Sequence, residues 1–302
     1  MFKLKLLTAT RTIEQTMPFM LYRLLLCLGL GLVLLLACLI GAGTVIGFGS
    51  FSKNPASFAA FGATLGLLAS FYAAYRLRGV WLYSLSASHL ALLATQIRGD
   101  SIPEGAAQIG YAKQRVSTCF PARADLEALD QATCASLMSL AALKCPVLFA
   151  QQPLLQKAVQ GLAGWLFAAN RQTVLAWYFY TDADNGWRSA RTAISALSAH
   201  FGDVFRLRLI LSLFEWLGFL LACYLMLYPA DAVAAALPVA IGLWEYVFAV
   251  VFAYGLKMAF LEPISEAALM DSVFSHIEAK PAEEAALSEA SPAFRDIQQR
   301  SL

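Results

Sequence analysis

The chain has 302 residues, of which 59% are hydrophobic and 14% are charged, and its mean hydropathy is +0.62. These values exclude an ordinary soluble domain and predict an integral membrane protein. The formal net charge of +2 is close to balance, so the composition gives no reason to expect a nucleic-acid or polyacid partner.

Residues 1–18 form a basic segment ahead of the first long apolar run. We expect a short cytoplasmic or interfacial helix here, lying among the lipid headgroups. A cleaved lipoprotein leader is the competing interpretation, because Leu35–Cys38 resembles a lipobox. The apolar run continues well past Cys38, which favours a span that is retained.

Two uncharged runs, Leu24–Ser52 and Asn54–Tyr75, follow each other across a short connection. The first would reach roughly 44 Å as a helix, which exceeds the hydrocarbon core of a bilayer. We therefore predict a first transmembrane hairpin over residues 19–78.

Residues 79–207 are predicted to form a helical domain. Val80–Ile97 has apolar residues at helical spacing and stops at Gly99, Ser101–Glu104 resembles a capping box that opens a helix, and Asp125–Leu143 has a leucine stripe. Residues 133–150 are apolar enough to suggest a further span, but Lys144 and Pro146 favour a buried or interfacial helix.

The second half of this domain is rich in aromatic residues, which suit a packed core or a membrane-interface belt. Asp182–Gly186 predicts a turn whose acidic side chains cap the following helix. The candidates for docking a partner are four aromatic residues: Trp165, Trp177, Tyr178 and Trp187.

A second transmembrane hairpin is predicted over residues 208–260, from the runs Leu209–Tyr228 and Ala232–Leu256. Pro229–Asp231 is predicted to be the turn between them. Residues 261–302 are polar and predict a cytoplasmic tail, mobile from Lys280 onward.

Lysine and arginine gather at the span ends next to both termini and the middle domain. By the positive-inside rule, these parts lie on the cytoplasmic side of a bacterial-type inner (plasma) membrane. The predicted fold is an all-α integral membrane protein with four transmembrane helices, arranged as two hairpins with a helical cytoplasmic domain between them.

Motifs for catalysis, metal binding and cofactor binding are missing from the sequence. Its six cysteines show no CxxC spacing and its three histidines are isolated. There is no GxSxG, Walker or dinucleotide-binding pattern. We therefore expect no catalytic residue, metal or cofactor, and a membrane enzyme is disfavoured.

Glu215 and Glu245 interrupt the third and fourth predicted spans, Glu245 near the middle of its span. A carboxylate inside a span costs on the order of 2.5–3.5 kcal/mol, so such residues usually face a partner, a cavity or a water path. The functional interpretation is a proton or cation path. The structural one is a hydrogen bond to a neighbouring helix, or an ion pair of Glu215 with Arg206 or Arg208.

Gly43 and Gly47, and likewise Gly62 and Gly66, form GxxxG steps that predict close helix packing or an oligomer contact. Gly43–Gly47 with Phe51 is also similar to the GTVxG stretch of the proton-channel subunits that energise TonB-type and Tol systems. Their flagellar-motor stator relatives share the plan of two hairpins around a large cytoplasmic region. That family carries the stretch in later spans, whereas here it closes the first.

Thr44–Gly49 also resembles a potassium-channel filter with one residue inserted. Such filters follow a separate pore helix, whereas this segment continues the first span.

The leading hypothesis is a channel- or transporter-like subunit of an oligomeric membrane complex, with Glu245 and Glu215 on an ion or solute path. The alternative is a non-catalytic scaffold or assembly subunit that docks a partner through its cytoplasmic helices. Both require the lipid bilayer and either further copies of the chain or other membrane subunits as partners, and neither involves nucleic acid.

Overall fold

A computed structural model describes residues 6–49, 55–145, 151–236, 244–278 and 280–302, and all regular structure in these ranges is helical. The predicted connections over 50–54 and 146–150, and part of the predicted fourth span, lie outside the described residues. Four helices are long and apolar enough to cross a membrane. Together with the helical middle region they form two hairpins, which confirms the predicted fold class.

Contacts between residues divide the chain into two compact units. The helical unit comprises Met1–Phe19, Leu82–Glu215 and Pro263–Leu302, and the span unit comprises Met20–Trp81 and Trp216–Glu262. Both ends of the chain therefore belong to the same unit as the middle region.

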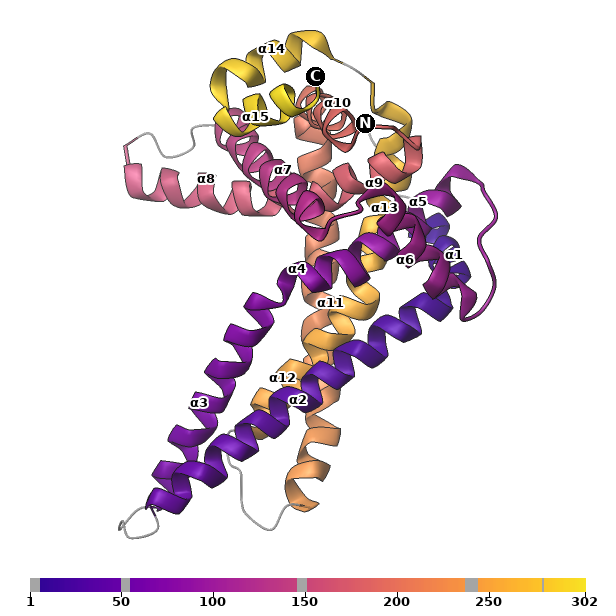
Figure 1. The fold of residues 1–302 in the computed structure, drawn as a ribbon. Coiled ribbons are helices and arrows are strands. Elements are labelled where there is room, and N and C mark those ends of the chain that lie inside the picture. The colour runs from indigo at the N-terminus through magenta and orange to yellow at the C-terminus, as the bar shows by residue number, and fades with distance from the viewer. Residues whose placement is uncertain (1–5, 50–54, 146–150, 237–243, 279) are drawn as a thin grey trace. The chain divides into compact units, whose positions relative to one another are not determined.

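Apolar helices make up the two hairpins (Figure 1). They are α2 (Met17–Gly49), α3 (Pro55–Arg76), α11 (Phe201–Ala236) and α12 (Trp244–Leu256). The chain stays helical beyond α3 through α4 (Arg78–Trp81) and the π-helical turn η1 (Leu82–Ser86), and beyond α12 through η2 (Lys257–Leu261). Most large side chains on the span helices remain exposed, as expected for surfaces that contact lipid.

The predicted turn at Pro229–Asp231 is wrong, because α11 continues through Pro229 to Ala236. Proline removes one backbone hydrogen bond, but transmembrane helices tolerate it where neighbouring groups satisfy the freed carbonyl. Helix α12 begins at Trp244, so Glu245 lies in its first turn. Residues 237–243 of the predicted fourth span lie outside the described residues, so the place of Glu245 near the middle of that span stays a prediction.

The helical unit contains the remaining helices. They are α1 (Leu6–Gln15), α5 (Ala87–Arg98), α6 (Ala107–Cys119), α7 (Arg123–Lys144), α8 (Pro153–Ala168), α9 (Arg171–Thr181), α10 (Gly186–Ala199), α13 (Glu262–Val273), η3 (Phe274–His276), α14 (Pro281–Ala290) and α15 (Pro292–Arg300).

Helix α5 lies at the centre of this unit and is buried on almost every side. It ends at Gly99, whose φ of +91° closes the helix in the left-handed conformation, as the sequence predicts. Helix α1 packs on α5 and buries Ala9 and Ile13, while the ring of Phe19 stacks on His89 at 5.1 Å. The N-terminal helix is thus part of the helical core.

Two local predictions need correction. Helix α6 begins at Ala107 and not at Ser101, because Gly105 adopts a φ of +61° and delays the helix. The cap of α10 is Asn185 and not an aspartate, and its Oδ1 accepts hydrogen bonds from the backbone N–H of Trp187 (2.8 Å) and Arg188 (3.3 Å).

Helix α7 confirms the leucine stripe predicted over Asp125–Leu143. Its second half buries Leu137 and Leu140 and exposes Met138 and Leu143. Of the buried or interfacial helix predicted over 133–150, the helix is confirmed as far as Lys144.

The predicted mobile tail is also wrong, since the C-terminal residues form α14 and α15 and pack on α7 and α10 (Figure 1). Each helix starts with a proline, and the Ser291 hydroxyl accepts a hydrogen bond from the Phe294 N–H. Phe294 and Ile297 are fully buried. These two apolar residues fix a segment whose composition is otherwise polar.

Candidate functional site

The acid that interrupts the third predicted span is held by an arginine on the same helix. Glu215 is 5% exposed, and its Oε1 lies 3.9 Å from Nη2 of Arg208. Arg208 also donates from Nη1 to Oε1 of Glu266 on α13 at 2.8 Å. Thr173 on α9 donates to the other oxygen of Glu266 at 3.5 Å. Three helices of the helical unit therefore meet at one buried guanidinium, in the geometry that the structural interpretation of Glu215 requires.

Glu245 lies in a different setting, half-buried in the first turn of α12. Within the described part of the chain no cation pairs with it. A carboxylate in the first turn of a helix is favoured by the helix dipole. The structure assigns the two acids to different units, Glu215 to the helical unit and Glu245 to the span unit.

A second buried ion pair lies inside the span unit, where Arg23 on α2 donates to Oε2 of Glu262 at 2.7 Å. The Lys257 ammonium lies 5.9 Å from the centre of the Trp216 ring. Neither contact was predicted, because the two residues of each pair are far apart along the chain.

Glycines bring α2 and α3 into backbone contact. A Cβ added at Gly62 would lie 2.1 Å from the carbonyl oxygen of Gly41, and one added at Gly66 would lie 2.2 Å from that of Ala37. The other predicted packing glycines, Gly43 and Gly47, have nothing within 4 Å of an added Cβ. The residues of α2 that meet Gly62 and Gly66 are Gly41 and Ala37, which are also four residues apart. Gly41 was not predicted, because it belongs to neither GxxxG step.

The four aromatic docking candidates fall into two groups. Tyr178 is buried, Trp177 packs on Tyr180 and Phe274, and Trp187 lies beneath the guanidinium of Arg300 at 4.7 Å. Trp165 on α8 is 57% exposed. The aromatic-rich stretch therefore serves mainly as core, and Trp165 alone among the four presents a largely open ring.

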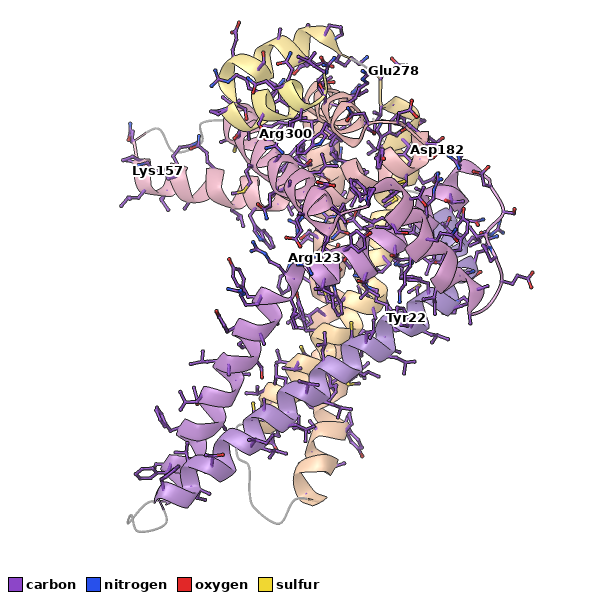
Figure 2. The ribbon with its side chains drawn as sticks, viewed as in Figure 1. Tyr22, Arg123, Lys157, Asp182, Glu278 and Arg300 are labelled. Carbon is purple, nitrogen blue, oxygen red and sulfur yellow. The ribbon has the colours of Figure 1, made fainter. Side chains whose placement is uncertain are left out.

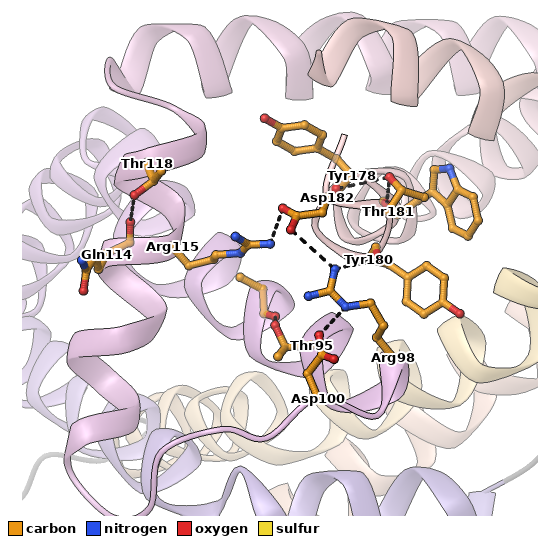
Figure 3. A network of polar contacts seen from close by, with 12 residues as sticks. Thr95, Arg98, Asp100, Gln114, Arg115, Thr118, Tyr178, Tyr180, Thr181 and Asp182 are labelled. Carbon is orange, nitrogen blue, oxygen red and sulfur yellow. Dashed lines mark hydrogen bonds and ion pairs between the residues drawn. The ribbon is translucent and has the colours of Figure 1, made fainter. Parts of the chain in front are cut away.

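A polar network surrounds Asp182, at the end of α9 (Figure 3). Its Oδ1 pairs with Nη2 of Arg115 on α6 at 2.5 Å, and its Oδ2 lies 3.9 Å from Nη1 of Arg98 on α5. Arg98 also donates to the Tyr180 carbonyl at 3.2 Å and pairs with Asp100. The φ of Asp182 is +52°, a left-handed conformation that aspartate tolerates better than most residues. This turn directs the carboxylate at both guanidiniums.

Beside this network lies a groove of about 230 Å³, lined by Tyr111, Gln114, Arg115 and Thr118 of α6. Helix α6 contains no acidic residue, and Arg115 is its contribution to the Asp182 network. The groove thus presents hydroxyl, amide and guanidinium groups on one helix, and its guanidinium, that of Arg115, is held in place by Asp182. Such a surface can receive carbonyl and carboxylate oxygens of a ligand.

Cys119, the last residue of α6, and Tyr178 on α9 affect each other's pKa. Burial raises the pKa of Tyr178 to about 12, with a smaller contribution from Cys119. Burial also raises the pKa of Cys119, which Arg115 partly offsets. Both groups are therefore protonated at neutral pH, and the Cys119 thiol is a poor nucleophile.

No group of three histidine, cysteine, aspartate or glutamate side chains gathers at one point in the described ranges. Comparison of the chain with protein-family models, with curated proteins and with solved structures found no match. The function must therefore be inferred from the chain's own geometry.

Proposed function

We propose that this chain is a non-catalytic, multi-pass membrane subunit that holds a partner protein through the groove beside α6. Four candidate spans anchor the chain, and a packed helical unit presents the groove. The observation that carries the proposal is the fixing of Arg98 and Arg115 by Asp182, which orders the groove wall before any ligand binds. Preorganised side chains lose less entropy on binding, which favours a protein contact.

The same arrangement indicates which partner chemistry fits. Within α6, Lys113 and Arg115 are the charged residues, and Gln114 and Thr118 expose an amide and a hydroxyl. An acidic or carbonyl-rich segment of a partner complements this face better than a basic one. The same proposal places the helical unit on the cytoplasmic side of a bacterial-type inner membrane and the chain in an oligomer or hetero-complex. The distribution of basic residues supports the cytoplasmic placement.

Filling the groove tests this proposal. We expect Gln114→Trp, at an exposed position, to leave the fold intact and to reduce at least tenfold the recovery of a stoichiometric partner extracted from native membranes. Native mass spectrometry of the nanodisc-extracted complex measures both the partner's mass and its ratio to this chain. Ser117→Trp is the matched control, because Ser117 is exposed on the same helix and does not line the groove.

The expected pattern is loss of the partner from the first variant and retention in the second. The proposal is overturned if the chain is recovered without any stoichiometric protein partner, or if both variants retain the partner equally.

A channel or transporter subunit is the second candidate, and Glu245 is the observation that favours it. Its carboxylate is half-buried in a candidate span without an ion-pair partner in the described ranges, whereas Glu215 is bound to Arg208. We expect Glu245→Gln to abolish proton or potassium flux into dye-loaded proteoliposomes while the chain stays folded. Glu104→Gln, in an exposed loop, is the control. Unchanged flux in the Glu245 variant would rule out a path through that carboxylate.

A further inference from the structure

Exposed large apolar side chains in the helical unit concentrate on α8 and on its neighbour α7. In the described ranges they lie on α7 and α8, apart from Leu7, Met17, three residues of α11 (Leu209, Ile210 and Leu213) and Leu302. On α8 they are Leu154, Leu155, Leu162 and Trp165, with exposed fractions between 47% and 82%. A cluster of exposed apolar side chains of this kind marks a surface that contacts a membrane or another protein.

The side chains follow a single face of α8. Leu154, Leu162 and Trp165, with Ala158 between them, recur at spacings of four, four and three residues, which places them along one stripe. The opposite side of the helix packs on α7, where Gly164 lies against the backbone of Met138. Helix α8 extends away from the other helices of the unit, so the stripe is open along its length (Figure 1).

The charges around the stripe suit a lipid surface. Lys157 is the sole charged residue of α8, and it is exposed (Figure 2). The sequence contains no aspartate or glutamate from residue 131 to residue 181, whereas it contains three basic residues there, Lys144, Lys157 and Arg171. A helix with leucine and tryptophan on one face and lysine beside it has the composition of helices that lie in the headgroup region of a bilayer.

The chain also connects α8 to the membrane. The ring of Phe167, near the end of α8, packs at 4.8 Å on Phe201, the first residue of α11, which contains the third candidate span. Because α8 is linked to a candidate span, its binding to the bilayer surface is an intramolecular step with a high effective concentration. A modest apolar face is then enough to hold the helix at that surface.

We propose that α8 is an in-plane interfacial helix, with Leu154, Leu162 and Trp165 inserted among the lipid acyl chains and Lys157 at the headgroups. This role is independent of the partner groove, which lies on α6. It assigns the exposed ring of Trp165 to lipid and not to a protein partner.

Quenching of tryptophan emission by brominated lipid tests the assignment. The full-length chain is reconstituted in nanodiscs made of phosphatidylcholine brominated near the glycerol end of the acyl chain, and compared with nanodiscs of unbrominated lipid. We expect the emission component that Trp165→Phe removes to be at least halved by the brominated lipid. The component that Trp187→Phe removes should be unaffected, because Trp187 is packed beneath Arg300.

A second measurement uses the unaltered chain, so it does not depend on the folding of a variant. Nanodiscs containing a lipid with a diazirine in its acyl chain are irradiated, and the labelled peptides are mapped by mass spectrometry. Adducts on residues 153–168, in addition to the spans, support the interfacial helix. The proposal is overturned if adducts are confined to the spans, if aqueous iodide quenches Trp165 while brominated lipid does not, or if neither quenches it because a second copy or another protein covers α8.

Discussion

The α2–α3 hairpin and the core of the helical unit hold their helices together by different means. In the hairpin, backbone meets backbone at Gly41, Gly62 and Gly66, without charged groups. In the helical unit, large apolar side chains fill the core. The Arg208 guanidinium on α11 binds Glu266 of α13, which also accepts a hydrogen bond from Thr173 of α9. Lipid is as apolar as leucine, so the hydrophobic effect does not drive two spans together. Close van der Waals contact between the helices stabilises their association instead. In water the burial of apolar side chains itself drives packing, and that drive can offset the burial of an ion pair.

Breaking the buried guanidinium contact should give the largest effect. We expect Arg208→Met to destabilise the helical unit by about 3–5 kcal/mol, because it leaves the Glu266 carboxylate buried without its cation. Arg206→Met, at an exposed position of the same helix, should change little. Denaturant unfolding of the nanodisc-embedded protein, followed by tryptophan emission, provides the comparison.

The double variant Arg208→Met with Glu266→Met sharpens this result. It should recover part of the lost stability, because the Glu266 carboxylate is removed together with its cation, whereas Glu215 stays buried without Arg208. A single variant that loses less than about 1 kcal/mol, the usual worth of an exposed pair, would show that the site is solvated in solution.

The apolar part of the helical unit is tested at its C-terminal end. Phe294→Ala should cost about 3 kcal/mol, since it empties a fully buried site where α15 packs on α7 and α10. The effect should be local, with amide hydrogen exchange accelerated over 281–300 and unchanged in α5. Arg295→Ala, exposed next to it, is the control. Equal protection in both variants would mean that these two helices do not depend on the apolar core.

The hairpin responds to added volume and not to lost charge. Gly62→Ala should destabilise it by about 1–3 kcal/mol, because the new methyl group meets the Gly41 carbonyl and forces the helices apart. Gly43→Ala adds the same methyl group to open space, so we expect no loss and a gain of up to about 1 kcal/mol from the better helix former. Thermal unfolding of both variants in nanodiscs checks the difference, and equal midpoints would refute the backbone contact.

The smallest effect should come from a carboxylate at the surface of the helical unit. Hydrogen bonding from Ser198 (2.5 Å) and the nearby Lys144 lower the pKa of Glu283 below its ordinary value of 4.5. The stabilisation is therefore present above pH 4.5 and is lost as the pH falls through the lowered pKa. We expect Glu283→Gln to cost about 0.5–1 kcal/mol at pH 7 and almost nothing at pH 2. A cost that stays constant from pH 7 to pH 2 would contradict this origin.

Some residues of the candidate sites were predicted from the sequence and others were not. Charges within apolar runs pointed to Glu215 and Glu245, since each carboxylate breaks a pattern that is local along the chain. The Asp182 network was not predicted, because Arg98, Arg115 and Asp182 come from three separate helices and none of them is unusual in its own segment. The same holds for Arg208 and Glu266, which are far apart along the chain.

The sequence by itself determined the membrane class, the two hairpins and most helices of the middle region, because these depend on hydrophobic runs, periodicity and stop signals such as Gly99. Only the tertiary structure decided that Pro229 lies inside a helix, that the polar C-terminal residues fold onto α7 and α10, and that Gly41 rather than Gly43 meets the second span. The last two outcomes are fixed by contacts with residues distant in the chain. Such contacts override local composition because burial and close packing contribute more free energy than the propensity of a single residue.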